Sequence, residues 1–197
     1  AAKMWAENPR LAEPVDAETA DAILEEAGKI AADVLAPINR EGDEIGTKLI
    51  DGKVVTPPGF KEAYKQYVDG GWPSMSHPVE YGGQGLPYSL STSMAEWFSG
   101  ANHSWAMYPG LSQGCMETLK AHGTEEQKKI YLEKLVEGSW TGTMCLTESH
   151  CGSDLGMLKC KAEPAEDGNY KLTGTKIFIS AGEHDMSDNI VHIVLAR

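Results

Sequence analysis

The sequence predicts an α+β protein in which an all-helical part is followed by an all-β part. In the first part, apolar residues recur at steps of three and four, which is typical of amphipathic helices. Beyond Gly138, apolar and polar residues alternate, which is typical of strands. We therefore expect a helical domain over residues 1–139 and a β domain over residues 140–197.

The first helix is expected over residues 16–38, where Asp16 can cap the start and Pro37 marks the end. Thr124 begins a capping-box pattern that opens another helix, and Gly138 ends that helix. The other predicted helices cover residues 58–68, 87–99 and 110–121. We assign to the core an apolar stripe formed by Leu90, Met94, Trp97 and Phe98.

The β domain is expected to contain short strands joined by tight turns. Asp167-Gly168 is typical of a hairpin turn, and Asp51-Gly52 forms a similar turn in a polar stretch of the helical domain. The predicted strands cover residues 141–147, 158–163, 170–172, 176–180 and 189–196.

The composition excludes several classes of function. The chain has 197 residues and a formal net charge of −12, which argues against nucleic acid because a phosphate backbone requires a basic face. No apolar run approaches the roughly 20 residues of a membrane span. The chain begins without the pattern of a secretory signal. We expect a cytoplasmic protein with neither a nucleic-acid partner nor a membrane span.

The four cysteines are interpreted as reduced thiols that pack as small apolar side chains. Cys145, Cys151 and Cys160 lie near His150 in the sequence, but their spacing matches no common zinc pattern. We therefore expect no metal.

Two segments have a composition that suits a planar, polar cofactor. Residues 144–156 begin as an apolar strand and then turn through hydroxyls, carboxylates and glycines. Residues 176–182 form a second apolar strand, which ends in an aromatic, a hydroxyl, a small residue and a glycine. Glycine permits close approach of the backbone, and the hydroxyls offer short hydrogen-bond donors.

These segments resemble the acyl-CoA dehydrogenase family. The first segment matches the signature of this family: an apolar residue and Thr-Glu, then Gly-Ser-Asp, then a further Gly. The second segment matches a strand that comes later in the sequences of the family. Residues 80–86 and 122–132 match in the expected order. The pairing of the two segments is most similar to the longer bacterial branch that includes 3-methylmercaptopropionyl-CoA dehydrogenase.

The resemblance implies a helical domain, an antiparallel β-barrel-like middle domain and a second helical domain. We expect this chain to be a truncated member, which lacks the usual first helix and ends within the middle domain. The implied activity is FAD-dependent α,β-dehydrogenation of an acyl-CoA thioester to the trans-2-enoyl-CoA. The expected substrate is 3-methylmercaptopropionyl-CoA or a short or medium acyl-CoA. An electron-transferring flavoprotein is the expected electron acceptor, and a homodimer or homotetramer is the expected assembly.

The resemblance also assigns flavin contacts within the first segment. Met144, Leu146 and Thr147 are expected along the flavin ring, with the Thr147 hydroxyl as the main donor. Ser153 is expected at the FAD pyrophosphate and close to the substrate. Without the resemblance, Thr147 reads as a strand-end hydroxyl bonded to its own backbone, and Ser153 as an ordinary turn serine.

In the second segment, Phe178 is expected to pack on the flavin ring and Ser180 to donate toward its N5 atom. Glu148 and Asp154 are interpreted as structural parts of the turn. The resemblance places the catalytic base, a glutamate, beyond Arg197, so no residue of this chain is assigned a catalytic role.

Two alternatives remain open from the sequence. One is an acyl-CoA oxidase of the same fold, which differs in how oxygen reaches the reduced flavin. The other is a non-catalytic interaction module that kept the fold and lost the chemistry.

Overall fold

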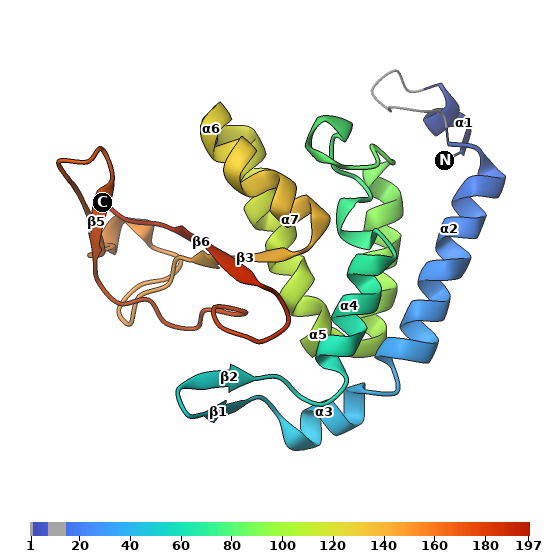
Figure 1. The fold of residues 1–197 in the computed structure, drawn as a ribbon, viewed down its shortest axis with the longest axis horizontal. Coiled ribbons are helices and arrows are strands. Elements are labelled where there is room, and N and C mark those ends of the chain that lie inside the picture. Colours follow the sequence, from blue (N-terminus) through green and yellow to red (C-terminus); the bar gives the residue numbers. More distant parts are fainter. Residues whose placement is uncertain (1, 8–14) are drawn as a thin grey trace.

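The computed structural model describes residues 2–7 and 15–197 (Figure 1). The helices are α1 (Ala2–Ala6), α2 (Ala17–Lys29), α3 (Asn39–Ile45), α4 (Phe60–Asp69), α5 (Tyr88–His122), α6 (Glu125–Gln127) and α7 (Glu133–Glu137). Two π-helical stretches, Ile30–Leu35 and Lys128–Leu132, follow α2 and α6. The strands are β1 (Lys48–Ile50), β2 (Lys53–Val55), β3 (Trp140–Cys145), β4 (Lys161–Pro164), β5 (Tyr170–Thr173) and β6 (Asn189–Val194).

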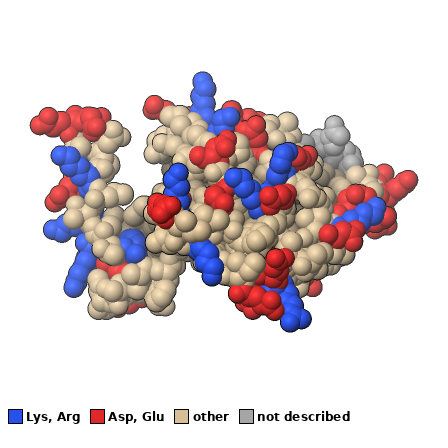
Figure 2. All heavy atoms as spheres, turned by 60° about the horizontal axis from the view of Figure 1, so that its bottom comes forward, with Lys and Arg blue, Asp and Glu red and all other residues tan. Residues whose placement is uncertain are grey.

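The long helices pack side by side, and the strands β3 to β6 form a lobe beside them (Figure 1). The predicted α+β order of a helical part followed by strands is therefore confirmed, but the first part is not all-helical, because it also contains the β1–β2 hairpin. None of the helices that the structure describes combines the length and the apolarity of a membrane span. Figure 2 shows acidic and basic side chains scattered in small groups over a surface that consists mainly of other residues.

Two predicted helix starts are confirmed by their capping hydrogen bonds. Asp16 Oδ1 accepts from the Thr19 amide at 2.8 Å, and α2 begins at the next residue. At α6, Thr124 Oγ1 accepts from the Gln127 amide at 3.2 Å, while Gln127 Oε1 accepts from the Thr124 amide at 2.9 Å. Each cap satisfies amide groups that the first helical turn leaves without a partner.

Helix α5 corrects the prediction of separate helices over residues 87–99 and 110–121. The residues between them are also helical, and the run is broken only at Asn102, with φ −157° and ψ 89°. The side chain of Asn102 accounts for this break: its Oδ1 accepts from the Trp105 amide at 3.0 Å, and its Nδ2 donates to the Leu35 carbonyl at 3.3 Å. Asn102 thus caps the second half of α5 while remaining buried.

The helical core is built on an aromatic cluster. Trp105 is fully buried, lies edge-to-face with Tyr67 and Phe98, and donates from Nε1 to the Phe60 carbonyl at 3.1 Å. Leu90, Met94 and Phe98 of the expected stripe are buried. Trp97 is 40% exposed, so its assignment to the core was wrong.

The strands form three separate pairs. β1 with β2 and β4 with β5 are antiparallel hairpins around the two predicted tight turns. β3 and β6 pair in parallel, from Trp140 opposite Asn189 to Cys145 opposite Val194, which differs from the antiparallel arrangement expected of this part. A parallel pair requires a long crossover, and the chain between Cys145 and Asn189 supplies it.

Strand β3 lies directly against α5. The Gly142 amide donates to Ser112 Oγ at 3.0 Å. A Cβ atom at Gly142 would lie 2.4 Å from the Cβ of Cys115, so only glycine permits this approach. The contact fixes the β lobe on the helical part.

Candidate functional site

The two segments singled out in the sequence lie side by side, although nineteen residues separate them along the chain. The Ile177 amide donates to the Thr147 carbonyl at 2.9 Å. Thr143 Oγ1 donates to the Ser180 carbonyl at 2.6 Å. These bonds join β3 and the residues after it to the second segment, as the hypothesis of a shared site requires.

The second segment is not the strand that was predicted over residues 176–180. It is an irregular stretch with two left-handed residues, Phe178 at φ 56° and Ala181 at φ 55°. Left-handed φ angles are incompatible with a regular strand. The strand prediction was wrong because a short apolar run such as Ile177-Phe178-Ile179 carries no information about φ.

Glu148 lies at the centre of the first segment and is buried. Its carboxylate accepts from the amides of Lys159 and Cys160 at 2.8 and 2.9 Å, and from Lys176 Nζ at 3.0 Å. Burial alone would raise the pKa of Glu148, but these hydrogen bonds and the Lys176 charge lower it to about 2. Glu148 is therefore an ionised anchor for the turn, in agreement with the structural role expected of it.

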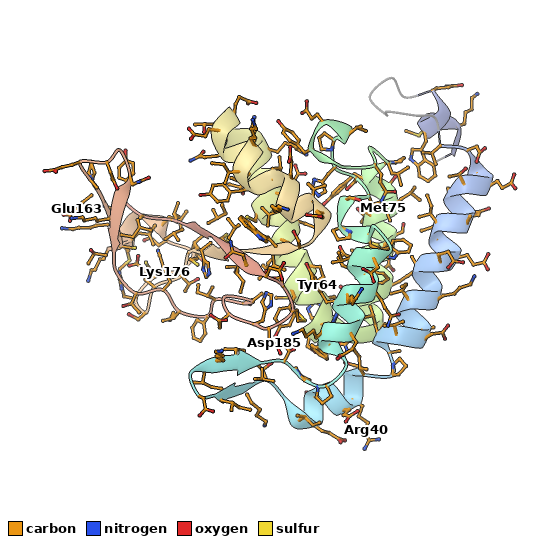
Figure 3. The ribbon with its side chains drawn as sticks, in the orientation of Figure 1. Arg40, Tyr64, Met75, Glu163, Lys176 and Asp185 are labelled. Atoms are coloured by element: carbon orange, nitrogen blue, oxygen red, sulfur yellow. The ribbon has the colours of Figure 1, made fainter. Side chains whose placement is uncertain are left out.

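Lys176 was not identified from the sequence. Its Nζ also donates to the Leu146 carbonyl at 2.9 Å, so it joins both segments (Figure 3). The sequence assigned Glu148 to the turn without predicting its burial, so nothing in it called for a positive partner such as Lys176.

The predicted cofactor contacts differ in their exposure. Thr147 and Leu146 are half-buried at the end of β3, whereas Met144 is 54% exposed. Ser153 lies exposed in the turn, where Asp154 Oδ1 accepts from the Gly156 amide at 3.0 Å. In the second segment, Ser180 is exposed and the Phe178 ring is 88% exposed.

Glu148, His150 and Cys151 bring potential metal ligands within 4.8 Å of one another. However, the Lys176 ammonium lies 3.0 Å from Glu148 and opposes a second cation there. His150 Nε2 also lies 3.0 Å from the Met157 carbonyl, the geometry of a hydrogen bond that holds the turn. These contacts are those of a hydrogen-bonded turn with a buried ion pair.

His184, which received no role from the sequence, is buried between β3 and α5. Its Nδ1 accepts from the Met186 amide at 3.2 Å, so the ring proton lies on Nε2 and is directed at Thr141 Oγ1, 3.0 Å away. Tyr108 of α5 packs edge-on against the imidazole, with ring centroids 5.2 Å apart. Burial lowers the pKa of His184 below its usual value, against the opposing effect of Asp185 and Glu183.

A cavity of about 260 Å³ lies between the two halves of α5 and near α4. Its wall is mainly apolar, with several hydroxyls and one amide side chain. Residues from both halves of α5 line it, among them Met94, Phe98, Ala106, Pro109, Gly110 and Gln113. The sequence did not indicate this cavity, because it depends on how the two halves of α5 meet.

Comparison with known proteins identifies the class to which this fold belongs. Residues 17–139 match the model of the family described as "Acyl-CoA dehydrogenase, N-terminal domain". The chain therefore belongs to the acyl-CoA dehydrogenase family, whose members are oxidoreductases acting on CH–CH donors.

Among its relatives, the chain is 47% identical over 183 residues to 3-methylmercaptopropionyl-CoA dehydrogenase of Ruegeria pomeroyi. This match covers 93% of the chain and 31% of the relative, so the chain spans about a third of that protein's length.

Solved structures agree with this assignment. Butyryl-CoA dehydrogenase from Megasphaera elsdenii matches with a TM-score of 0.75 and 28% identity, over 90% of this chain and 43% of that one. An acyl-CoA dehydrogenase from Bacillus anthracis, solved in complex with FAD, matches with a TM-score of 0.74 and 27% identity, over 95% and 30%.

Proposed function

We propose that this chain supplies the helical region and part of the β region of an FAD-dependent acyl-CoA dehydrogenase. The reaction converts an acyl-CoA thioester to the trans-2-enoyl-CoA. The observation that carries the proposal is the junction at the second signature segment, which is bonded to the first segment through Ile177–Thr147 and to the adjoining β3 residue through Thr143–Ser180. The 47% identity to a 3-methylmercaptopropionyl-CoA dehydrogenase supports it.

The residues at this junction fit a flavin. Thr147 and Ser180 carry hydroxyls at the edge of the junction, and Phe178 presents an aromatic ring that is 88% exposed. A planar ring system could cover Phe178 and accept hydrogen bonds from both hydroxyls. When bound, FAD supplies the hydride acceptor of the reaction.

In this proposal Thr147 and Ser180 donate hydrogen bonds to the ring, where negative charge develops during hydride transfer. Met144 and Leu146 contact the ring by packing and by their backbone. Ser153 binds the pyrophosphate and lies near the substrate, since an exposed, glycine-rich turn offers amide and hydroxyl donors to phosphate.

We further propose that the cavity beside α5 holds the acyl chain. Its apolar wall suits a hydrocarbon or thioether chain, and its volume of about 260 Å³ lies below the roughly 300–1,000 Å³ of pockets for drug-sized ligands. A short or medium acyl group, including the 3-methylmercaptopropionyl group, is therefore the preferred occupant. Tyr108, which packs on His184 beside the second segment, lies on the same helix as the cavity residues Pro109 and Gly110.

The catalytic base is proposed to lie outside this chain. Glu148 is the one buried carboxylate near the junction among the described residues, and its oxygens already accept three hydrogen bonds. A carboxylate with its pKa near 2 is a poor proton acceptor at neutral pH. We also propose that an electron-transferring flavoprotein accepts the electrons. The complete protein would form a homodimer or a homotetramer and would be located in the cytoplasm.

The test uses the complete gene product that contains this chain. It should purify with the visible absorbance of a flavin, and anaerobic addition of 3-methylmercaptopropionyl-CoA or butyryl-CoA should bleach that absorbance. Absence of a flavin, or absence of bleaching with every acyl-CoA tried, would overturn the proposal.

Two measurements distinguish the alternatives. Consumption of one oxygen per acyl-CoA in air would favour an acyl-CoA oxidase, whereas reduction of an added electron-transferring flavoprotein favours the dehydrogenase. Stable folding without flavin and without turnover would favour the non-catalytic interaction module.

A further inference from the structure

The loop of residues 177–183 adopts a conformation that its own sequence does not favour. Phe178 and Ala181 both have positive φ angles, which side chains with a Cβ rarely adopt. Such residues persist only where the surrounding structure holds them in place. Phe178 is itself almost fully exposed, so the restraint comes from other residues: the Thr143 hydroxyl bonds the Ser180 carbonyl in the middle of the loop, and further contacts hold its two ends.

One end of the 177–183 loop is held by Lys176, which binds Leu146 and Glu148. The other end is held by the neighbouring residues His184 and Asp185, whose contacts run in different directions. His184 is fixed to Thr141 on β3 and packs on Tyr108 of α5, as described above.

Asp185 reaches the end of the β1–β2 hairpin, 129 residues earlier in the sequence (Figure 3). Its Oδ1 accepts from Thr56 Oγ1 at 2.7 Å and from the Thr56 amide at 3.2 Å. Partial burial raises the pKa of Asp185, but the two Thr56 hydrogen bonds and the charge of Lys61 hold it below its usual value. Asp185 is therefore a charged acceptor for a buried threonine.

We propose that His184 and Asp185 are positioning residues that hold the 177–183 loop in its flavin-binding conformation by anchoring it to β3, α5 and the end of β2. This inference rests on the proposed function, since the loop carries the proposed flavin contacts Phe178 and Ser180. It adds that residues of the helical part, Thr56 and Tyr108, control a cofactor site in the β lobe.

The test compares Thr56→Val with Thr56→Ser in the complete gene product. Valine keeps the shape of threonine and removes the hydroxyl that bonds Asp185, whereas serine retains the hydroxyl. Thr56→Val should weaken the binding of FAD to the apoprotein on the order of tenfold, the effect of losing one hydrogen bond to a charged group. It should also alter the fine structure of the bound-flavin absorbance, and Thr56→Ser should restore both.

A measurement without cofactor separates positioning from general destabilisation. In the Thr56→Val apoprotein, amide hydrogen exchange should accelerate over residues 177–183 while α2 keeps its wild-type protection. Asp185→Asn should show the same pattern. Wild-type FAD affinity, absorbance and exchange in Thr56→Val would overturn this inference alone, whereas a wild-type protein that binds no FAD would overturn the proposed function and this inference with it.

Discussion

Lys176 Nζ lies 3.0 Å from Glu148 Oε1, and both side chains are almost completely buried. The two residues are 28 positions apart in the sequence and join the two segments, and the same ammonium bonds the Leu146 carbonyl. Breaking a buried pair by removing one partner leaves an uncompensated charge, which costs much more than the loss of an exposed pair.

Lys176→Met should therefore lower the melting temperature by several degrees, because the Glu148 carboxylate loses its positive partner. Glu148→Gln should also destabilise, but the double variant should be less destabilised than the sum of the two single changes. Thermal unfolding of the four proteins gives the coupling between the residues. Lys65→Met is the matched control, since the Lys65–Asp69 pair is exposed and its loss should change little. Simple additivity of the two buried changes would contradict the prediction.

The low pKa of Glu148 predicts an acid-sensitive stability. Its pKa is about 2 in the folded protein against an ordinary value of 4.5, so on acidification the unfolded chain takes up a proton first. The contribution of Glu148 is complete above pH 4.5 and is lost as the pH falls toward 2. Urea unfolding at stepped pH should show a steeper loss for wild type than for Glu148→Gln in this window. Parallel curves would show that Glu148 does not carry the effect.

The Gly142–Cys115 contact predicts a strict size limit between β3 and α5. Gly142→Ala would place a methyl group 2.4 Å from the Cys115 Cβ, and overpacking of this kind costs about 1–3 kcal/mol. The free energy of unfolding in urea should fall accordingly. Adding Cys115→Gly to the Gly142→Ala chain should recover part of the lost stability. The recovery is smaller by about 1 kcal/mol, because glycine within a helix is itself destabilising. Unchanged stability in Gly142→Ala would mean that the strand can move away from the helix.

Local signals in the sequence were sufficient for much of this fold. Helix starts at Asp16 and Thr124 and the turn at Asp51-Gly52 follow from bonds within a few residues, and all are present. Asn102 shows the limit of such signals. The residue ends one half of α5 and caps the next by a bond to Trp105, while its amide also bonds Leu35, 67 residues away. No local pattern indicates that distant partner.

The candidate site likewise contains residues that local sequence patterns indicate and residues that they do not. Thr147, Ser153 and Ser180 are proposed as site residues because their neighbours form a pattern along the chain. Lys176 and Asp185 are not indicated by such a pattern, because each acts through a partner that only folding brings near, 28 residues away for Glu148 and 129 for Thr56. The parallel pairing of β3 with β6 was also inaccessible, since alternation in a strand does not specify the direction of its neighbour.

The cavity beside α5 predicts a change in acyl-chain preference. Gly110 lines the cavity, and a Cβ added there meets no atom within 4 Å, so Gly110→Leu introduces no clash at its Cβ, and we expect its side chain to narrow the cavity. In the complete gene product, kcat/KM for a medium acyl-CoA should fall roughly tenfold more than for the 3-methylmercaptopropionyl or butyryl thioester, the discrimination that hydrophobic pockets achieve for small changes in size.

Gly114→Leu is the matched control: it lies one turn further along α5, also has open space for a Cβ, and is not a lining residue of this cavity. Both substitutions raise helix propensity equally, so a general effect on α5 would appear in both. Equal losses for all chain lengths in Gly110→Leu, or the same selectivity change in Gly114→Leu, would place the acyl chain elsewhere.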